Sequence, residues 1–378
     1  MKTSSVARVL GVAAVALAAA PVFAADDRVP ATRGFYGNLL LGAGYFDLES
    51  NLVAGNDLID ASTRTIASVT QAPPSNDTTY AIVSGELAYA FGNQWEAFFG
   101  VSIEDYVTLD FSTRLGARKQ WDGIGVLGAS FVTTAALPTE VWADPYLVGT
   151  PRLATERDSN GVRLDWWRIF GTGFFAQLQS REIDVDTEAS GTDPALGLGA
   201  DEILLLRRDG TNSRATLGYR WETGRHTWQP EFTFTTADRD GGAIAAEATT
   251  LQLSYGYRGD IWTLAASASL FQRDHDEANP VYGLKTDADG YAVSLSAFRK
   301  LDLALATGAL SPTSSTPRTT PTSISTTPQP SLPASGSHIS LDVEEFRVRF
   351  RDPERDRDVV GSSVRVSMGC MSPGRNCW

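Results

Sequence analysis

The stretch RATLGYRWETGRHTWQPEFTFTT at residues 214–236 decides the fold class. Its first half alternates apolar with polar side chains: Ala215, Leu217, Tyr219 and Trp221 alternate with Arg214, Thr216, Gly218, Arg220 and Glu222. The turn Thr223-Gly224-Arg225 then reverses the chain into a second segment of similar length. Period-two alternation predicts strands with one apolar and one polar face, and the short link predicts an antiparallel hairpin.

Segments of this kind recur along most of the chain. Twelve strands are predicted, at 35–48, 79–91, 94–104, 108–120, 123–134, 161–170, 173–184, 212–222, 226–236, 248–258, 260–272 and 289–300. Tight turns (92–93, 121–122, 171–172, 223–225 and 259) alternate with long polar links near 49–78, 135–160, 185–211, 237–247 and 273–288. Only the link near 105–107 is short where a long one is expected. This alternation predicts an all-β fold, an antiparallel transmembrane β-barrel with its long links outside the cell.

A soluble β-sandwich is the alternative, because its strands also alternate. The polar face here carries many small residues and arginines, which suits a water-filled lumen better than a soluble exterior. We therefore favour the membrane barrel.

The first 24 residues are predicted to be a secretory signal peptide. The basic residues Lys2 and Arg8 precede a short apolar run at 9–20, and Ala24 is the last residue before an acceptable cleavage site. The run is too short for a spanning helix, and no later segment is long and apolar enough. Strands must therefore cross the membrane, which places the barrel, at 25–302, in the outer membrane of a Gram-negative bacterium. Its expected partners are outer-membrane lipid and the barrel-assembly machinery.

Charge and cysteine content exclude several classes. The formal net charge is −13, which argues against nucleic-acid binding and against a basic face for anionic lipid headgroups. Both cysteines, Cys370 and Cys377, lie in the last nine residues, so the body has no disulfide framework and no cysteine-based metal site. The acid clusters of the long links lack the spacing of a calcium loop, and we expect no metal and no cofactor.

Residues 303–337 hold six prolines and sixteen serines or threonines, a composition typical of disorder. The charged tail at 338–378 contains one candidate strand, at 339–350. The tail is either a genuine linker or the product of a reading-frame slip, and the abrupt end of the strand pattern favours the slip. In both cases we expect a gapped ring, because prolines exclude strands through 311–333.

Parity assigns side chains to the two faces of the barrel. The predicted lumen-lining residues are Arg114, Arg118, Arg163, Arg181, Arg214, Arg220, Arg258, Glu86, Asp110, Asp165 and Glu231. The predicted membrane-interface aromatics, beside short turns, are Phe91, Trp121, Trp221, Trp228, Tyr257 and Trp262.

An arginine-lined lumen predicts a porin-like channel for small solutes, anions among them, since guanidinium binds carboxylates in a planar fork. Two alternatives stay open. The arginines could instead form ion pairs that hold a narrow barrel rigid, and the protein could be a non-conducting structural or adhesion barrel acting through its extracellular loops. Enzyme activity is not expected, because His275 between two aspartates is the only suggestive group and nothing indicates a third residue to hold it.

The chain resembles a family of proteobacterial outer-membrane proteins, the domain of unknown function numbered 2860. The resemblance covers roughly 34–302 and rests on five segments. These are LPTEVWADPYLVGTPR at 137–152, GVRLDW at 161–166, ESNLVAG at 49–55, residues 94–105, and NPVYG at 279–283 with Tyr291. It implies a secreted barrel of 14 strands ending on an aromatic residue, and brings no substrate or catalytic residue. This chain departs from the family pattern after residue 302.

Overall fold

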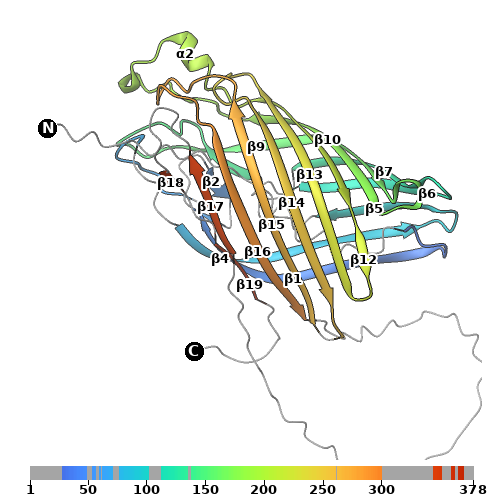
Figure 1. The fold of residues 1–378 in the computed structure, drawn as a ribbon. Coiled ribbons are helices and arrows are strands. Elements are labelled where there is room, and N and C mark those ends of the chain that lie inside the picture. The colour runs from blue at the N-terminus through green and yellow to red at the C-terminus, as the bar shows by residue number, and fades with distance from the viewer. Residues whose placement is uncertain are drawn as a thin grey trace, which may run out of the picture.

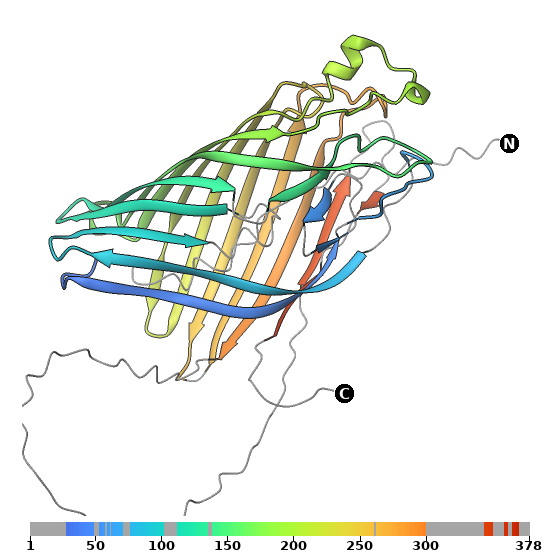
Figure 2. The same cartoon turned by 180° about the vertical axis from the view of Figure 1, so that it is seen from behind.

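One antiparallel sheet curves into a barrel, with long links gathered at one end and short turns at the other (Figure 1, Figure 2). The structure, a computed structural model, describes residues 28–48, 53–56, 59–60, 62–70, 76–101, 112–134, 138–260 and 262–299, with strands at 344–350, 359–361 and 365–369. In these residues no helix has the length and apolarity needed to cross a membrane.

All twelve predicted strands are present as the wall of the barrel. They are β1 (Gly34–Leu48), β4 (Asn76–Ala90), β5 (Trp95–Val101), β6 (Ser112–Trp121), β7 (Gly125–Thr134), β9 (Ala154–Trp167), β10 (Phe174–Val185), β11 (Gly210–Tyr219) with its continuation β12 (Trp221–Thr223), β13 (His226–Arg239), β14 (Ala246–Arg258), β15 (Trp262–His275) and β16 (Ala288–Arg299). Each pairs antiparallel with the next.

The long links carry the short elements. These are β2 (Val53–Asn56), β3 (Ile59–Asp60), β8 (Thr139–Trp142), the 3-10 helix η3 (Pro194–Leu196) and the helix α2 (Ala200–Leu204). The 3-10 helix η2 (Ile169–Gly171) lies instead in the short turn between β9 and β10. The sequence predicted an irregular link at 135–160. Instead, β9 begins at Ala154, and its first four residues pair with β8. The wall therefore extends beyond the predicted strand at its long-link end.

The two faces of the wall are inverted relative to a soluble protein. Leucines such as Leu115, Leu178 and Leu217 are more than half exposed on the outer face. Gln229 and Ser254 on the inner face are fully buried. Because an apolar exterior is stable only in contact with lipid, the molecule is a transmembrane β-barrel.

Glycines on the inner face make room for buried aromatic rings. A Cβ on Gly218 of β11 would lie inside van der Waals contact with the ring of Phe175 on β10, and Gly116 makes similar room for Phe98. Both rings are almost completely buried. The glycines thus allow ring-over-backbone packing between neighbouring strands.

We expect Gly218→Ala to lower the free energy of unfolding by about 1–3 kcal/mol, because the new methyl group must displace the Phe175 ring. Urea titration of the refolded barrel measures the change. Ala215→Val, on the exposed face of the same strand, is the matched control and should change stability little. Equal stability of wild type and Gly218→Ala would show that the ring has room to move.

The tail differs from the sequence-based expectation. Only 339–350 was expected to form a strand, but the structure contains β17 (Glu344–Phe350), β18 (Val359–Gly361) and β19 (Arg365–Gly369). β17 pairs with β16, and β19 pairs with β1 in register from Ala43↔Gly369 to Asp47↔Arg365. The expectation of a single tail strand is wrong, because the free edges of β16 and β1 provide pairing partners even for short segments with few β-branched residues. The Ser/Thr/Pro segment lies outside the described residues.

Candidate functional site

Polar and charged side chains are concentrated in two regions, the inner face of the barrel wall and the mouth covered by the long links. On the wall, the predicted lumen residues occupy inner positions of their strands. Those with described side chains on this face are Arg114, Arg118, Arg163, Arg181, Arg214, Arg220, Glu86, Asp165 and Glu231. Arg258 is exposed at the end of β14, and Asp110 lies outside the described residues.

Arg118 is the centre of the strongest contact on the wall. Its guanidinium binds Glu86 through both Nη atoms, at 2.7 and 2.5 Å, and Glu96 at 2.9 Å. Its Cζ lies 3.8 Å from the ring centre of Phe98, and Tyr36 donates its hydroxyl hydrogen to Glu96. Glu96 is almost fully buried, so this network stabilises a charge that would otherwise be costly inside the wall.

Further arginines are also engaged within the wall. Arg163 Nε lies 3.0 Å from Asp165 Oδ1, and Arg220 Nε donates to Gln229 Oε1 at 2.8 Å. Gln229 in turn donates to Glu231. The ion-pair alternative raised by the sequence therefore describes part of the wall.

Arginines nevertheless outnumber carboxylates at the described inner positions of the strands. The arginines are Arg114, Arg118, Arg157, Arg163, Arg181, Arg214, Arg220, Arg239 and Arg273, and the carboxylates are Glu86, Glu96, Asp165 and Glu231. This part of the lumen carries positive charge although the whole chain is acidic.

The predicted interface aromatics lie at the short-turn end. Phe91, Trp121, Trp221 and Trp228 are exposed, and Tyr257 is partly exposed. Trp262 begins β15, and its side chain is outside the described residues. Beside them Trp95, Phe174 and Tyr219, which the sequence argument did not single out, are also exposed on the outer face.

At the mouth, the first and second long links are bonded together. β2 pairs with β8, and the indole of Trp142 donates to Ser62 Oγ at 2.8 Å. The guanidinium of Arg152 lies 4.5 Å from the Trp142 ring centre and donates to the carbonyl oxygens of Thr63 and, at 3.2 Å, Pro145. A buried arginine thus joins the two links.

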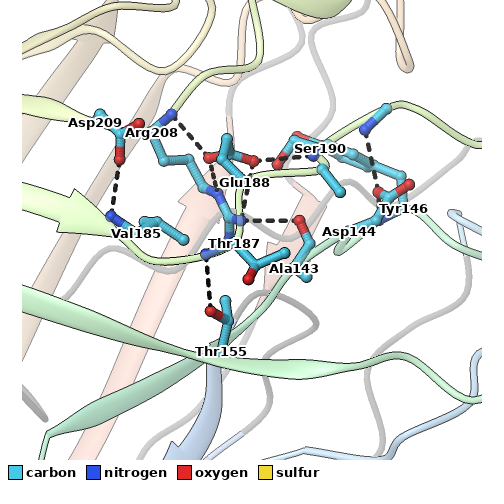
Figure 3. Close-up of polar contacts among 12 residues, drawn as sticks. Ala143, Asp144, Tyr146, Thr155, Val185, Thr187, Glu188, Ser190, Arg208 and Asp209 are labelled. Atoms are coloured by element: carbon cyan, nitrogen blue, oxygen red, sulfur yellow. Dashed lines mark hydrogen bonds and ion pairs between the residues drawn. The ribbon is translucent and has the colours of Figure 1, made fainter.

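The second link is hydrogen-bonded to the third, within which Glu188 and Arg208 form an ion pair (Figure 3). Arg208 Nε and Nη2 donate to the two carboxylate oxygens of Glu188 at 2.8 and 3.1 Å, and Nη2 also donates to the Ala143 carbonyl at 3.1 Å. Asp144 accepts from the backbone N–H of Tyr146 and, at 3.1 Å, of Gly191. Both side chains of the Glu188–Arg208 pair are mostly buried, so the pair is a buried ion pair that holds one specific geometry and not a surface ion pair.

Hydrogen bonds connect the third link to the fourth, the fourth to the fifth, and the fifth back to the second. Ala243 N donates to Leu205 O at 3.1 Å, and Glu277 N donates to Gly242 O at 3.0 Å. Asn279 Nδ2 then donates to the hydroxyl oxygen of Tyr146 at 3.0 Å, which returns to the second link. We call these linked segments, 53–56, 59–60, 62–70, 138–153, 186–209, 240–245 and 276–287, the mouth cap.

An apolar cluster lies at the centre of the mouth cap. Tyr146, Leu206 and Ala243 are buried in it, and Val69 and Tyr282 pack against it. These residues come from the links of β1/β4, β7/β9, β10/β11, β13/β14 and β15/β16, which are distributed around the ring. Links from opposite sides of a ring can share one cluster only by extending across it, so the mouth cap crosses the opening.

Burial and charge shift several pKa values in the mouth cap. Burial raises the pKa of Glu188, but the hydrogen bonds and charge of Arg208 outweigh it, so the pKa lies below its usual value. Burial raises the pKa of Tyr146 to about 12 and lowers that of Arg152 to about 10.

Acid should therefore loosen the mouth cap. A carboxylate whose folded-state pKa is depressed stabilises fully above its unfolded pKa, about 4.3 for glutamate, and loses this as pH falls through the folded value. We expect amide exchange of 186–209 to accelerate below about pH 4. Glu188→Gln should produce the same acceleration at neutral pH, whereas the exposed Glu247→Gln should not. If the amides of 186–209 exchange at the same rate in Glu188→Gln and Glu247→Gln, Glu188 does not stabilise the mouth cap.

The mouth cap was not predicted from the sequence, although the sequence contains a signal for it. Three of the five segments that carried the family resemblance meet here: 49–55 through β2, 137–152 through Trp142 to Arg152, and 279–283 through Asn279. Tryptophan, tyrosine and arginine in a polar link were the available clue, because such side chains in a link indicate burial against something.

This geometry places the chain in the class of transmembrane β-barrels whose mouth is crossed by loops that are hydrogen-bonded to one another. Within it, the chain belongs to the family described as protein of unknown function DUF2860, whose model matches residues 34–307. No curated protein matches the chain.

Two solved structures are similar at low identity. An anion-selective porin from Comamonas acidovorans is 12% identical, with 64% of this chain and 90% of the porin covered and a TM-score of 0.28. A bacterial polysaccharide outer membrane secretin is 8% identical, with 88% of this chain and 97% of the secretin covered and a TM-score of 0.31.

Proposed function

We propose that the protein is an outer-membrane channel for small anionic solutes, entered through the mouth cap. The observation that carries this proposal is the excess of arginine over carboxylate at the described inner positions. Arginine stays protonated at any physiological pH, so the positive potential in the lumen persists. A wall of one sign raises the local concentration of the opposite ion.

The arginines of β9, β10 and β11 are the ones most closely grouped. Arg163 on β9 and Arg214 on β11 both lie directly opposite Gln179 of β10 in the register, and Arg181 is two residues further along β10. Neighbouring strands are about 5 Å apart. Three guanidinium groups on adjacent strands would therefore act together on a passing carboxylate or phosphate.

Neutralising this group should reduce anion selectivity. We expect the triple change Arg163→Gln, Arg181→Gln and Arg214→Gln to move the reversal potential in a salt gradient toward cation selectivity. Refolded protein in a planar bilayer provides the measurement. Arg225→Gln is the matched control, because Arg225 lies at a short turn and is bound to Asp260 at 2.9 Å. An unchanged reversal potential in the triple variant would contradict the proposed role of these arginines.

A second function is favoured by the mouth cap itself. Links that share one buried cluster across the opening also suit a non-conducting barrel that presents a rigid surface to a partner outside the cell. The same bilayer experiment separates the two, since a non-conducting barrel inserts without producing current steps.

A further inference from the structure

At the short-turn end, the outer face of β1, β4, β5 and β6 carries a compact group of aromatic and basic side chains. We call it the rim patch. Its members are Arg33, Phe35, Tyr89, Phe91, Trp95, Lys119 and Trp121. All come from the ends of neighbouring strands, because Phe35 is opposite Tyr89 and Trp95 is opposite Lys119 in the register.

The aromatic rings of the rim patch are ordered by edge-to-face contacts. Phe35 and Tyr89 lie 4.7 Å apart between ring centres, and Tyr89 and Phe91 lie 5.1 Å apart. Trp95 and Trp121 form a second pair at 6.3 Å. The turn between the two groups is closed by the hydrogen bond from Phe91 N to Trp95 O at 2.9 Å.

A cation lies on each aromatic group. Lys119 Nζ is 4.8 Å from the Trp95 ring centre and 5.1 Å from that of Trp121. Arg33 donates from Nε to the Tyr89 hydroxyl at 2.7 Å, and its guanidinium carbon lies 5.8 Å from the same ring centre. Arg33 also packs against the turn, since a Cβ on Gly92 would lie 3.3 Å from Arg33 Cβ.

These contacts hold each cation in place and leave hydrogen-bond donors for a ligand. The ring contacts use no N–H of Lys119, and Arg33 uses only Nε, so the ammonium and both Nη groups can donate outward. In the described part of the chain, no carboxylate forms an ion pair with either residue. Arg225, at another short turn, is in contrast bound to Asp260.

We infer that the rim patch binds the phosphate of an anionic phospholipid. Aromatic rings at this level accept the upper acyl chain and glycerol region, and a cation above them meets the headgroup phosphate. Arg33 precedes β1 and Lys119 lies on β6, three strand spacings away, so the two cations are about 15 Å apart and each can bind the phosphate of a different lipid.

The acidic total charge had argued against binding to anionic headgroups. A negative total charge disfavours a broad basic face but does not prevent a local anion site, because ionic interactions beyond about 10 Å are screened at physiological salt. The inference is independent of the proposed channel, and lipid binding and conductance are measured separately.

The test uses the full refolded chain in vesicles of phosphatidylethanolamine with and without phosphatidylglycerol. Bromine-labelled acyl chains report lipid at the rim through quenching of tryptophan fluorescence, and native mass spectrometry counts retained lipid. We expect wild type to prefer phosphatidylglycerol, and we expect Lys119→Gln and Arg33→Gln each to reduce the preference about fivefold. Lys119→Arg should retain it, and Arg225→Gln should behave as wild type.

Three results would overturn the inference: equal binding of the two lipids by wild type, a preference that survives the double change of Lys119 and Arg33, or equal loss with Arg225→Gln. Displacement by free inorganic phosphate, or binding of lipopolysaccharide in place of phosphatidylglycerol at the patch, would also contradict a phospholipid site. Heat-modifiable mobility on gels confirms that each variant is folded.

Discussion

Leu206→Asp should release the mouth cap and raise single-channel conductance severalfold while the barrel stays folded. Leu206 has no exposed surface and lies with Tyr146 and Ala243 in the cluster shared by the links. A carboxylate there is without a counter-charge in an apolar environment, which costs several kcal/mol and exceeds what the surrounding hydrogen bonds can hold. The wall strands keep all their pairings, so only the links should undock.

Leu204→Asp is the matched control for this change. Leu204 ends α2 in the same link, but half of its surface is exposed, so a carboxylate there remains hydrated. Protease digestion of 186–209 reports undocking, and bilayer recording reports conductance. If the links become digestible while the current stays unchanged, the mouth cap is not the barrier to solutes.

Truncation after Asp302 should abolish the heat-resistant, urea-resistant form of the barrel. β17 pairs with β16 and β19 pairs with β1, so removing them exposes two strand edges. Each backbone donor or acceptor left unpaired in lipid costs several kcal/mol, and an edge exposes several. The loss should therefore be complete rather than graded.

Truncation after Gly369 is the control, since it keeps β19 and removes only residues 370–378. Gel mobility with and without heating compares the two chains. A stable barrel after truncation at Asp302 would mean that β1 and β16 can pair directly. The tail would then be dispensable, as the reading-frame hypothesis predicts.

The strands of the wall could be predicted from the sequence because the patterns that indicate them involve only neighbouring residues. Alternation in 214–222 assigns a face to each side chain from its immediate neighbours, and a three-residue turn defines the next partner. The family resemblance, likewise based on short segments, is confirmed by the match over 34–307.

The burial of some links could have been suspected from the sequence, but the contacts of the mouth cap could not be predicted because they join distant segments. Arg208 is an ordinary loop arginine in sequence, and only the fold brings it to Glu188 and the Ala143 carbonyl. The tail strands were missed for a related reason: β19 has five residues and its pairing depends on the free edge of β1. A strand so short has little intrinsic preference, and its partner determines its structure.

The pairing of β1 with both β4 and β19 has a consequence for the order of events during biogenesis. The first strand can pair with β4 early, but its other partner lies more than 300 residues further along the chain, since Asp47 pairs with Arg365. A folding intermediate must therefore persist in which one edge of β1 is unpaired, and that edge is exposed to aggregation until the long-range pairing forms. Such long-range closure is slow, so chaperone binding should be concentrated near the amino terminus of the emerging chain.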